Sequence, residues 1–170
     1  MNTDEFWQLI EATHQESGGD PEKQADLLVK ALVNMPVDAI LDYQRIQDGL
    51  ENRAYRGDLW NAAYLIGEGC GDDGFMDFRA WLIAQGRKVY EDAIQDPETL
   101  AELVSVERRF DTQWEGLLYV GGYAYEQKTN TQDGIPISQE LPSLDETHPL
   151  TDDDDELKTL YPKLWAKFGW

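Results

Sequence analysis

The stretch RAYRGDLWNAAYLIGEGCGDDGFMDFRAWLIAQGR, residues 53–87, decides the fold. Its first half carries apolar residues three and four positions apart, the spacing of an amphipathic helix: Leu59, Ala62, Ala63 and Ile66. Gly57-Asp58 opens this helix, and the acidic, glycine-rich turn GEGCGDDG ends it. Asp72 or Asp73 is expected to cap the next helix, which begins near Phe75. The stretch therefore predicts two consecutive helices joined by a tight turn.

The second of these helices extends the apolar pattern along one side with Phe75, Phe78, Leu82 and Val89. Gly86 lies inside the pattern, where it either bends the helix or lets another backbone come close. Asp96 and Pro97 then pair a capping residue with a first-position proline, which predicts a short helix over residues 100–104.

The N-terminal part of the chain shows the same helical periodicity. Thr3 and Asp4 are the expected entry caps of a first helix with the apolar face Phe6, Leu9, Ile10 and Thr13. Asp20 and Pro21 start a second helix, which carries Leu28, Ala31, Leu32 and Met35. Pro36 begins a third helix, so this region is predicted to be entirely helical.

The segment LLYVGGYAY, residues 117–125, admits two interpretations. Apolar residues from Phe110 to Tyr125 form a helical stripe, within which each glycine of the pair Gly121-Gly122 costs about 1 kcal/mol of helix propensity. A close helix crossing would explain that cost. The alternative is a pair of strands joined by a Gly-Gly turn.

The composition changes after residue 128. Residues 129–157 contain nine acidic residues and neither lysine nor arginine, and Pro136, Pro142 and Pro149 interrupt them. This segment is predicted to be an acidic arm that either lies over the helical body or is partly mobile. Asp152–Asp155 open a last helix, Pro162 forces a restart, and the aromatic terminus packs back. We expect a mainly α protein with a helical core at 1–128, and 129–170 belonging to the same domain.

The charge balance narrows the classes of partner. The chain has 170 residues, of which 14 are basic and 34 acidic, giving a net charge of −20. Nucleic-acid backbones and anionic membranes attract lysine and arginine, so this composition argues against both as partners. No apolar run approaches the roughly 20 residues that span a bilayer. A basic protein is the expected partner, while cation binding and simple solubility are also compatible with the charge.

The single cysteine bears on location and on catalysis. One cysteine cannot form an internal disulfide, and the acidic N-terminus does not resemble a signal peptide, so we expect a cytoplasmic protein. As a nucleophile Cys70 would need a histidine or a positive environment, but His14 and His148 are remote in sequence. One cysteine and two scattered histidines give no usual zinc spacing. We expect a structural thiol, no catalytic residues, no metal and no cofactor.

Two further patterns in the central stretch have simpler structural explanations. Residues 69–74 match GxGxxG, but a dinucleotide site needs a preceding strand, and here the preceding segment is predicted to be helical. Glu68, Asp72 and Asp73 could supply oxygen ligands to a hard cation, yet helix capping accounts for them equally well. The run Asp152–Asp155 is also better explained by capping, because consecutive helical side chains diverge.

A candidate pocket is predicted within the central stretch, where aromatic, acidic and scarce basic residues gather. Arg53, Arg56, Arg79 and Arg87 either pair with carboxylates to hold the helices together or form an anion-binding site. The candidate binding residues are Arg53, Tyr55, Asp58, Trp60, Cys70, Asp72, Asp73, Arg79 and Trp81.

Several segments together resemble a known family. They are DEFWQLIE near the start, Arg53-Ala54-Tyr55, Asp58-Leu59-Trp60, residues 62–66, Gly69-Cys70, Asp72-Asp73-Gly74-Phe75, Phe78-Arg79, Trp81-Leu82-Ile83, Gln85-Gly86-Arg87 and residues 161–165. The chain resembles the bacterial domain of unknown function DUF4240 over nearly its whole length. The resemblance implies a small, mostly helical bacterial protein, and it supplies no catalytic residues.

Three hypotheses of function follow. The leading one is a non-enzymatic, cytoplasmic binding or regulatory protein that acts through protein–protein contacts, for example an immunity-like partner of a basic toxin. The second is a small-molecule or enzymatic pocket within residues 53–87. The third is a nucleic-acid mimic, whose acidic groups are spaced like backbone phosphates.

Overall fold

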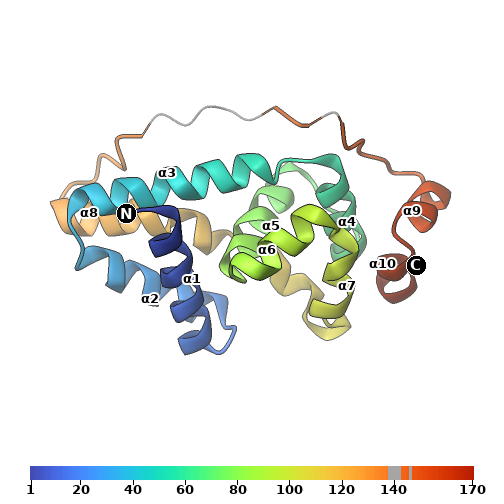
Figure 1. Ribbon diagram of the computed structural model, residues 1–170, viewed down its shortest axis with the longest axis horizontal. Coiled ribbons are helices and arrows are strands. Elements are labelled where there is room, and N and C mark those ends of the chain that lie inside the picture. Colours follow the sequence, from blue (N-terminus) through green and yellow to red (C-terminus); the bar gives the residue numbers. More distant parts are fainter. Residues whose placement is uncertain (138–142, 146) are drawn as a thin grey trace.

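The computed structural model describes residues 1–137, 143–145 and 147–170. Within them the chain is all-α (Figure 1), as predicted, and one isolated bridge between Arg56 and Asp145 is the nearest approach to a sheet. The described elements are α1 (Thr3–Ser17), α2 (Pro21–Val33), α3 (Val37–Arg53), α4 (Gly57–Gly67), α5 (Asp72–Ala84), α6 (Arg87–Gln95), η1 (Pro97–Thr99), α7 (Leu100–Leu103), η2 (Val106–Thr112), η3 (Glu115–Tyr119), α8 (Val120–Thr129), α9 (Asp154–Leu160) and α10 (Pro162–Phe168).

Most predicted helix starts are confirmed. Asp20 accepts a hydrogen bond from the Lys23 backbone N–H, with Pro21 as the first residue of α2. Asp96 plays the same part for η1, where it accepts from the Glu98 N–H. These caps satisfy backbone donors that have no partner inside the helix.

Three details of the prediction were wrong. The N-cap of α1 is Asn2, which forms a capping box with Glu5, so Thr3 and Asp4 lie inside the helix. Gly71 is the N-cap of α5, and neither Asp72 nor Asp73 caps it. Both aspartates lie in the first turn of α5, where their negative charge interacts favourably with the helix dipole. Gly86, with φ of 100°, ends the predicted long helix and separates α5 from α6.

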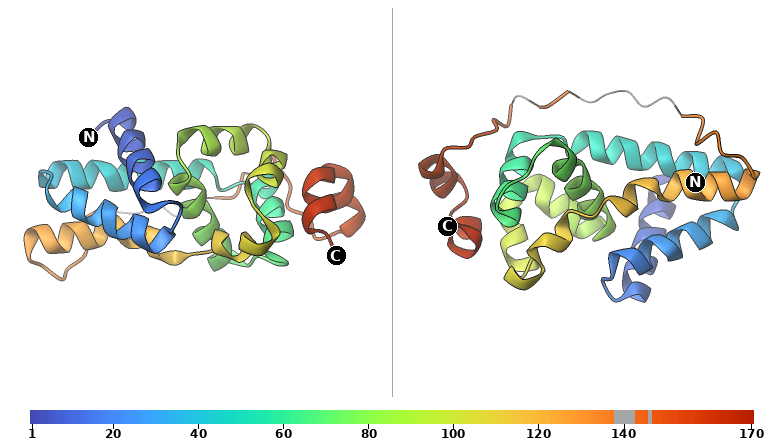
Figure 2. Two further views of the ribbon diagram at one scale, coloured as in Figure 1. Left: turned by 90° about the horizontal axis from the view of Figure 1, so that it is seen from below. Right: turned by 180° about the vertical axis from the view of Figure 1, so that it is seen from behind.

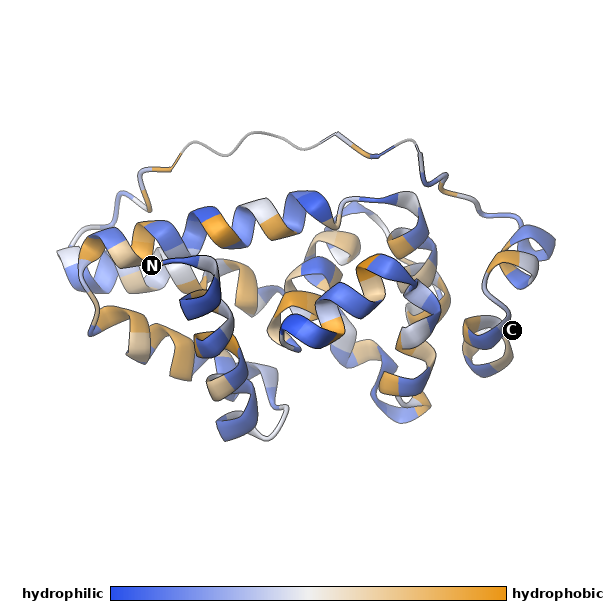
Figure 3. Ribbon diagram, in the orientation of Figure 1, coloured by the Kyte–Doolittle hydropathy of each residue, from blue (hydrophilic) through white to orange (hydrophobic). Residues whose placement is uncertain are grey.

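The core lies between the long helix α3 and the helices around it. Figure 1 and Figure 2 show α3 and α8 side by side at one end of the molecule with α1 and α2, and α4–α7 at the middle. Figure 3 shows hydrophobic and hydrophilic residues alternating along these helices, as amphipathic packing requires. The largest fully buried side chains include Tyr43, Tyr90, Phe6, Phe75 and Phe78.

The ambiguous segment 117–125 is helical, and the strand-pair alternative is wrong. It forms the end of η3 and the start of α8. An added Cβ at Gly121 would lie 2.2 Å from Gln44 Oε1 on α3, whereas nothing lies within 4 Å of one at Gly122. The first glycine therefore permits the close crossing of α3 and α8.

The C-terminal segment packs back on the body, as predicted. The arm contacts the link between α3 and α4, where the Asp145 N–H donates to the Tyr55 carbonyl at 3.1 Å. Helix α10 packs against α4 and α7, burying Leu164 and Phe168. Residues 138–142, with Pro142 of the predicted arm, and residue 146 lie outside the described residues. Within the described part of the chain, no helix is long and apolar enough to cross a membrane.

The contact between the arm and α4 is testable at a glycine. A Cβ on Gly57 would lie 2.1 Å from the His148 carbonyl oxygen and 2.5 Å from the Leu150 nitrogen. Both are backbone atoms, so a change of side-chain rotamer cannot relieve the clash. We expect Gly57→Ala to lower the free energy of unfolding by about 1–3 kcal/mol and to speed proteolysis of the arm. Denaturant unfolding measures the first effect, and limited digestion with a Glu-specific protease measures the second, because the arm contains glutamates but neither lysine nor arginine.

Gly122→Ala is the matched control, because its added methyl group meets nothing. It should leave the arm protected and stabilise α8 slightly. Equal proteolysis of Gly57→Ala and the wild type would contradict the packing of the arm on α4.

Candidate functional site

Three of the predicted site residues lie in one cluster of rings and charge. The Arg79 guanidinium carbon lies 4.7 Å from the centre of the Tyr55 ring and 5.3 Å from that of Phe75. Trp60 stacks on Phe75, with the two ring centres 4.7 Å apart and the ring planes 16° apart. Such arrangements combine cation–π attraction with apolar burial. The cluster joins α4 to α5.

Arg79 is directed inward to the end of a helix. Only 6% exposed, it donates to the Glu51 carbonyl at 2.9 Å and to the Phe75 carbonyl at 3.4 Å. The Glu51 carbonyl belongs to the last turn of α3, where carbonyls lack helical partners. Burial lowers the pKa of Arg79, because the charged form loses water. This guanidinium therefore stabilises the fold rather than facing an external anion.

The side chain of Glu51 shares this partly buried region. Burial raises the pKa of Glu51 to about 7, although a hydrogen bond from Gln47 and the charge of Arg79 both favour the ionised form. Gln47 Nε2 donates to Glu51 Oε1 at 2.9 Å, and Gln47 Oε1 is buried without a partner in the described residues. The side chain of Glu51 therefore gains or loses its proton near neutral pH.

The other three arginines of the central stretch form ion pairs. Arg53 binds Glu91 through two contacts of 2.7 Å, and Arg87 binds Asp4 at 2.8 Å. Arg56 donates hydrogen bonds to Asp58 through two nitrogens and also donates to the Ile94 carbonyl at 2.9 Å. These contacts hold α3, α4 and α6 together, and each of the three arginines already has a partner within the protein.

An open cleft of about 370 Å³ lies at the junction of α4 with the acidic arm. Its lining is aromatic and acidic: Trp60, Tyr64, Cys70, Leu150, Thr151 and Asp152. The Trp60 indole N–H donates to the Cys70 carbonyl at 2.8 Å, so the indole is held against the α4–α5 turn. Trp60 and Cys70 are the predicted residues that line this cleft.

Asn61, which the sequence did not single out, fixes the far wall of the cleft. This fully buried residue donates to the Pro149 carbonyl at 3.1 Å and accepts from the Thr151 N–H at 3.0 Å. A buried amide satisfied in this way holds the arm backbone rigidly beside α4. Its one sequence signal is a polar residue between apolar neighbours of the predicted helix.

Cys70 is not set up as a nucleophile. Burial raises the pKa of its thiol to about 12, and the nearby Asp77 adds to the shift. The two histidines are engaged elsewhere: His14 contacts Gln24, and His148 contacts Asp145. A thiol at this pKa is almost entirely protonated at neutral pH.

The remaining predicted residues are dispersed. Asp72 and Asp73 lie exposed in the first turn of α5. Trp81 lies in a separate cavity near the other end of α5, together with His14 and Arg108. Among the described residues, no three His, Cys, Asp or Glu side chains are grouped so as to hold a metal ion.

Comparison with known proteins adds the family. The model of a protein family of unknown function, DUF4240, matches residues 1–127. The chain belongs to the DUF4240 family. No curated protein and no solved structure matches it. The match ends within α8, so the family segment contains the α4 side of the cleft, whereas Leu150, Thr151 and Asp152 follow it.

The raised pKa of Glu51 predicts a specific dependence of stability on pH. A folded-state pKa of about 7, above the usual 4.5, means that the contribution of this group is complete at low pH and is lost as pH rises through about 7. Glu51→Gln keeps the shape but cannot ionise. At pH 8 we expect it to raise the free energy of unfolding by at most about 2–3 kcal/mol, with little change at pH 4.5.

Urea unfolding at pH 4.5 and pH 8 measures this difference, and the exposed Glu102→Gln is the control. If Glu51→Gln were less stable than the wild type at pH 8, the carboxylate would instead be ionised and stabilised by Arg79.

Proposed function

We propose that this DUF4240 protein is a non-enzymatic, cytoplasmic binding or regulatory protein whose partner is a basic protein. The cleft between Trp60, Tyr64 and Asp152 is proposed to receive one lysine or arginine side chain of that partner. The supporting observation is the lining itself, which places two aromatic rings and a carboxylate in one open cleft. Cations bind over aromatic faces, and a carboxylate beside them adds direct charge attraction.

The electrostatic surroundings favour a cation in this cleft. Burial is the main cause of the raised pKa values of Cys70 and Asp77, and acidic neighbours add to both: Asp77 to that of Cys70, Glu115 and Asp73 to that of Asp77. The contributions of these acidic neighbours reflect negative potential near the α4–α5 turn, whose Cys70 lines the cleft. A positively charged side chain entering here would relieve repulsion that the free protein carries.

The chain's own arginines are already bound within the protein and are too few to neutralise the acidic residues. Arg45, Arg53, Arg56, Arg87, Arg108 and Arg109 are in ion pairs, and Arg79 binds backbone carbonyls. With 34 acidic against 14 basic residues, 20 acidic charges have no basic residue to balance them. This net negative charge speeds encounter with a basic protein and makes the association sensitive to salt. An immunity-like partner of a basic toxin is one form of this function.

The cleft is testable with short peptides as probes. Titration with Gly-Arg-Gly-Arg and Gly-Lys-Gly-Lys peptides, followed by calorimetry at 50 and 300 mM salt, should show binding that weakens at the higher salt. We expect Asp152→Asn and Trp60→Phe each to weaken binding of the arginine peptide by about 3- to 30-fold. Gly-Glu-Gly-Glu should not bind.

Asp154→Asn is the matched control, because it removes the same charge from an exposed residue outside the cleft. Equal losses from Asp152→Asn and Asp154→Asn would indicate diffuse charge attraction and would remove the case for the cleft. The nucleic-acid mimic predicts such equal losses, together with competition by duplex DNA for the captured partner. Capture from the native cell with wild type and Asp152→Asn in parallel then identifies the partner.

A further inference from the structure

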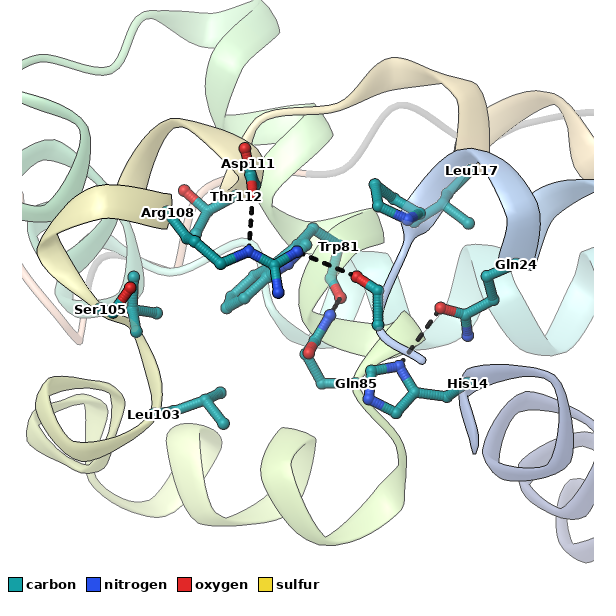
Figure 4. Close-up of a pocket in the computed structure, with 13 residues that line it drawn as sticks. His14, Gln24, Trp81, Gln85, Leu103, Ser105, Arg108, Asp111, Thr112 and Leu117 are labelled. Atoms are coloured by element: carbon teal, nitrogen blue, oxygen red, sulfur yellow. Dashed lines mark hydrogen bonds and ion pairs between the residues drawn. The ribbon is translucent and has the colours of Figure 1, made fainter. Parts of the chain in front are cut away.

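We infer that the protein has a second, separate site, which binds a small heterocycle of nucleobase type. The site is a cavity of about 280 Å³ between the α1–α2 turn, the C-terminal end of α5 and the segment from α7 to η3. Figure 4 shows His14, Trp81, Gln85 and Arg108 converging on it. Its walls include the apolar residues Leu103, Val104 and Leu117.

The hydrogen bonds of Gln24 determine what His14 presents. Gln24 Nε2 donates to the Ala84 carbonyl at 2.9 Å, which fixes Gln24 Oε1 as an acceptor. Oε1 lies 3.3 Å from His14 Nδ1, so this nitrogen must carry the proton. In the neutral ring Nε2 is then an acceptor. Gln85 behaves similarly, because its Nε2 donates to the Trp81 carbonyl at 3.2 Å and leaves Oε1 to accept.

Two donors add to these acceptors. Trp81 is only 7% exposed and lines the cavity, and its indole N–H is a donor. Arg108 uses Nε for Asp111 at 2.9 Å and Nη2 for the Gly19 carbonyl at 3.2 Å, while its Nη1 makes no hydrogen bond to the described chain. The hydroxyls of Ser105 and Thr112 and the carboxylate of Asp111 also line the cavity, which therefore offers both donors and acceptors beside its apolar walls.

This mixture selects one class of ligand. A simple carboxylate would satisfy Trp81 and Arg108 but would leave the acceptors of His14 and Gln85 desolvated, and an ammonium group would do the reverse. A planar heterocycle carries ring nitrogens, carbonyls and N–H groups on one edge and apolar faces for the walls. The volume is at the small end of ligand pockets, which favours a free base over a nucleotide.

The first experiment uses adenine, guanine, cytosine, uracil and hypoxanthine as probes, with benzoate and phenylacetate as planar acids of similar size. Amide NMR of the labelled protein follows the Trp81 indole cross-peak, identified by its absence from Trp81→Phe. We expect at least one base to bind with a micromolar to millimolar Kd and to shift this peak, and benzoate to bind at least tenfold more weakly.

Blocking the cavity supplies the control. Leu103 lines it and is 44% exposed, so Leu103→Trp should lower affinity for the base at least tenfold without disturbing the core. Leu160→Trp makes the same change at a leucine of 53% exposure outside the cavity and should bind like the wild type. Gln85→Met should weaken binding of the base and leave binding of benzoate unchanged.

Three results would overturn the inference. They are no binding by any base, binding that leaves the Trp81 peak unmoved, and binding that survives Leu103→Trp.

Discussion

The structure depends on finding partners for the backbone groups at helix ends. Short helices leave many such groups free, and in this all-α part of the chain side chains from other helices satisfy several of them. Arg79 and Tyr90 bind carbonyls in the last turns of α3, Arg56 binds the Ile94 carbonyl of α6, and Gln24 binds the Ala84 carbonyl of α5. Glu98 binds the N-terminal end of a helix instead, because its carboxylate accepts hydrogen bonds from the Lys163 and Leu164 N–H groups at the start of α10.

This constraint explains where the scarce basic residues lie. Carbonyl ends of helices attract cations, so Lys128 and Lys167 also reach the Val33 and Ala101 carbonyls. Basic side chains used in this way keep their charge but bind a backbone carbonyl rather than a carboxylate. The net negative charge itself comes from the composition, 34 acidic against 14 basic residues, and the cleft around Asp152 places one of these carboxylates beside the half-buried rings of Trp60 and Tyr64.

Local signals in the sequence predicted the helices, and contacts distant in sequence determined the rest. Asp20-Pro21 and Asp96-Pro97 are recognisable because a cap and its helix are neighbours in the chain. By contrast, Asn61 binds residues 149–151, and Trp81 shares its cavity with Arg108. No local pattern reports such pairings. The prediction that gathered nine central residues into one pocket treated nearness in sequence as nearness in space, and it placed Trp60 and Trp81 together although they line different cavities.

The two cavities nevertheless share one segment of the chain. Residues of η2 line the cavity that contains Trp81. The same segment holds the α4–α5 turn through the ion pair of Arg109 with Glu68 at 2.6 Å. Gln113, just beyond η2, donates to the Gly69 carbonyl at 3.4 Å and packs close to Gly67 and Gly74. That turn contains Cys70, which lines the cleft of Trp60 and Asp152. A contiguous chain of packed and hydrogen-bonded groups is the physical route by which two sites can be coupled. The geometry thus connects the cavity of Trp81 to the cleft of Trp60 through η2 rather than through α5, the helix that the sequence places between them.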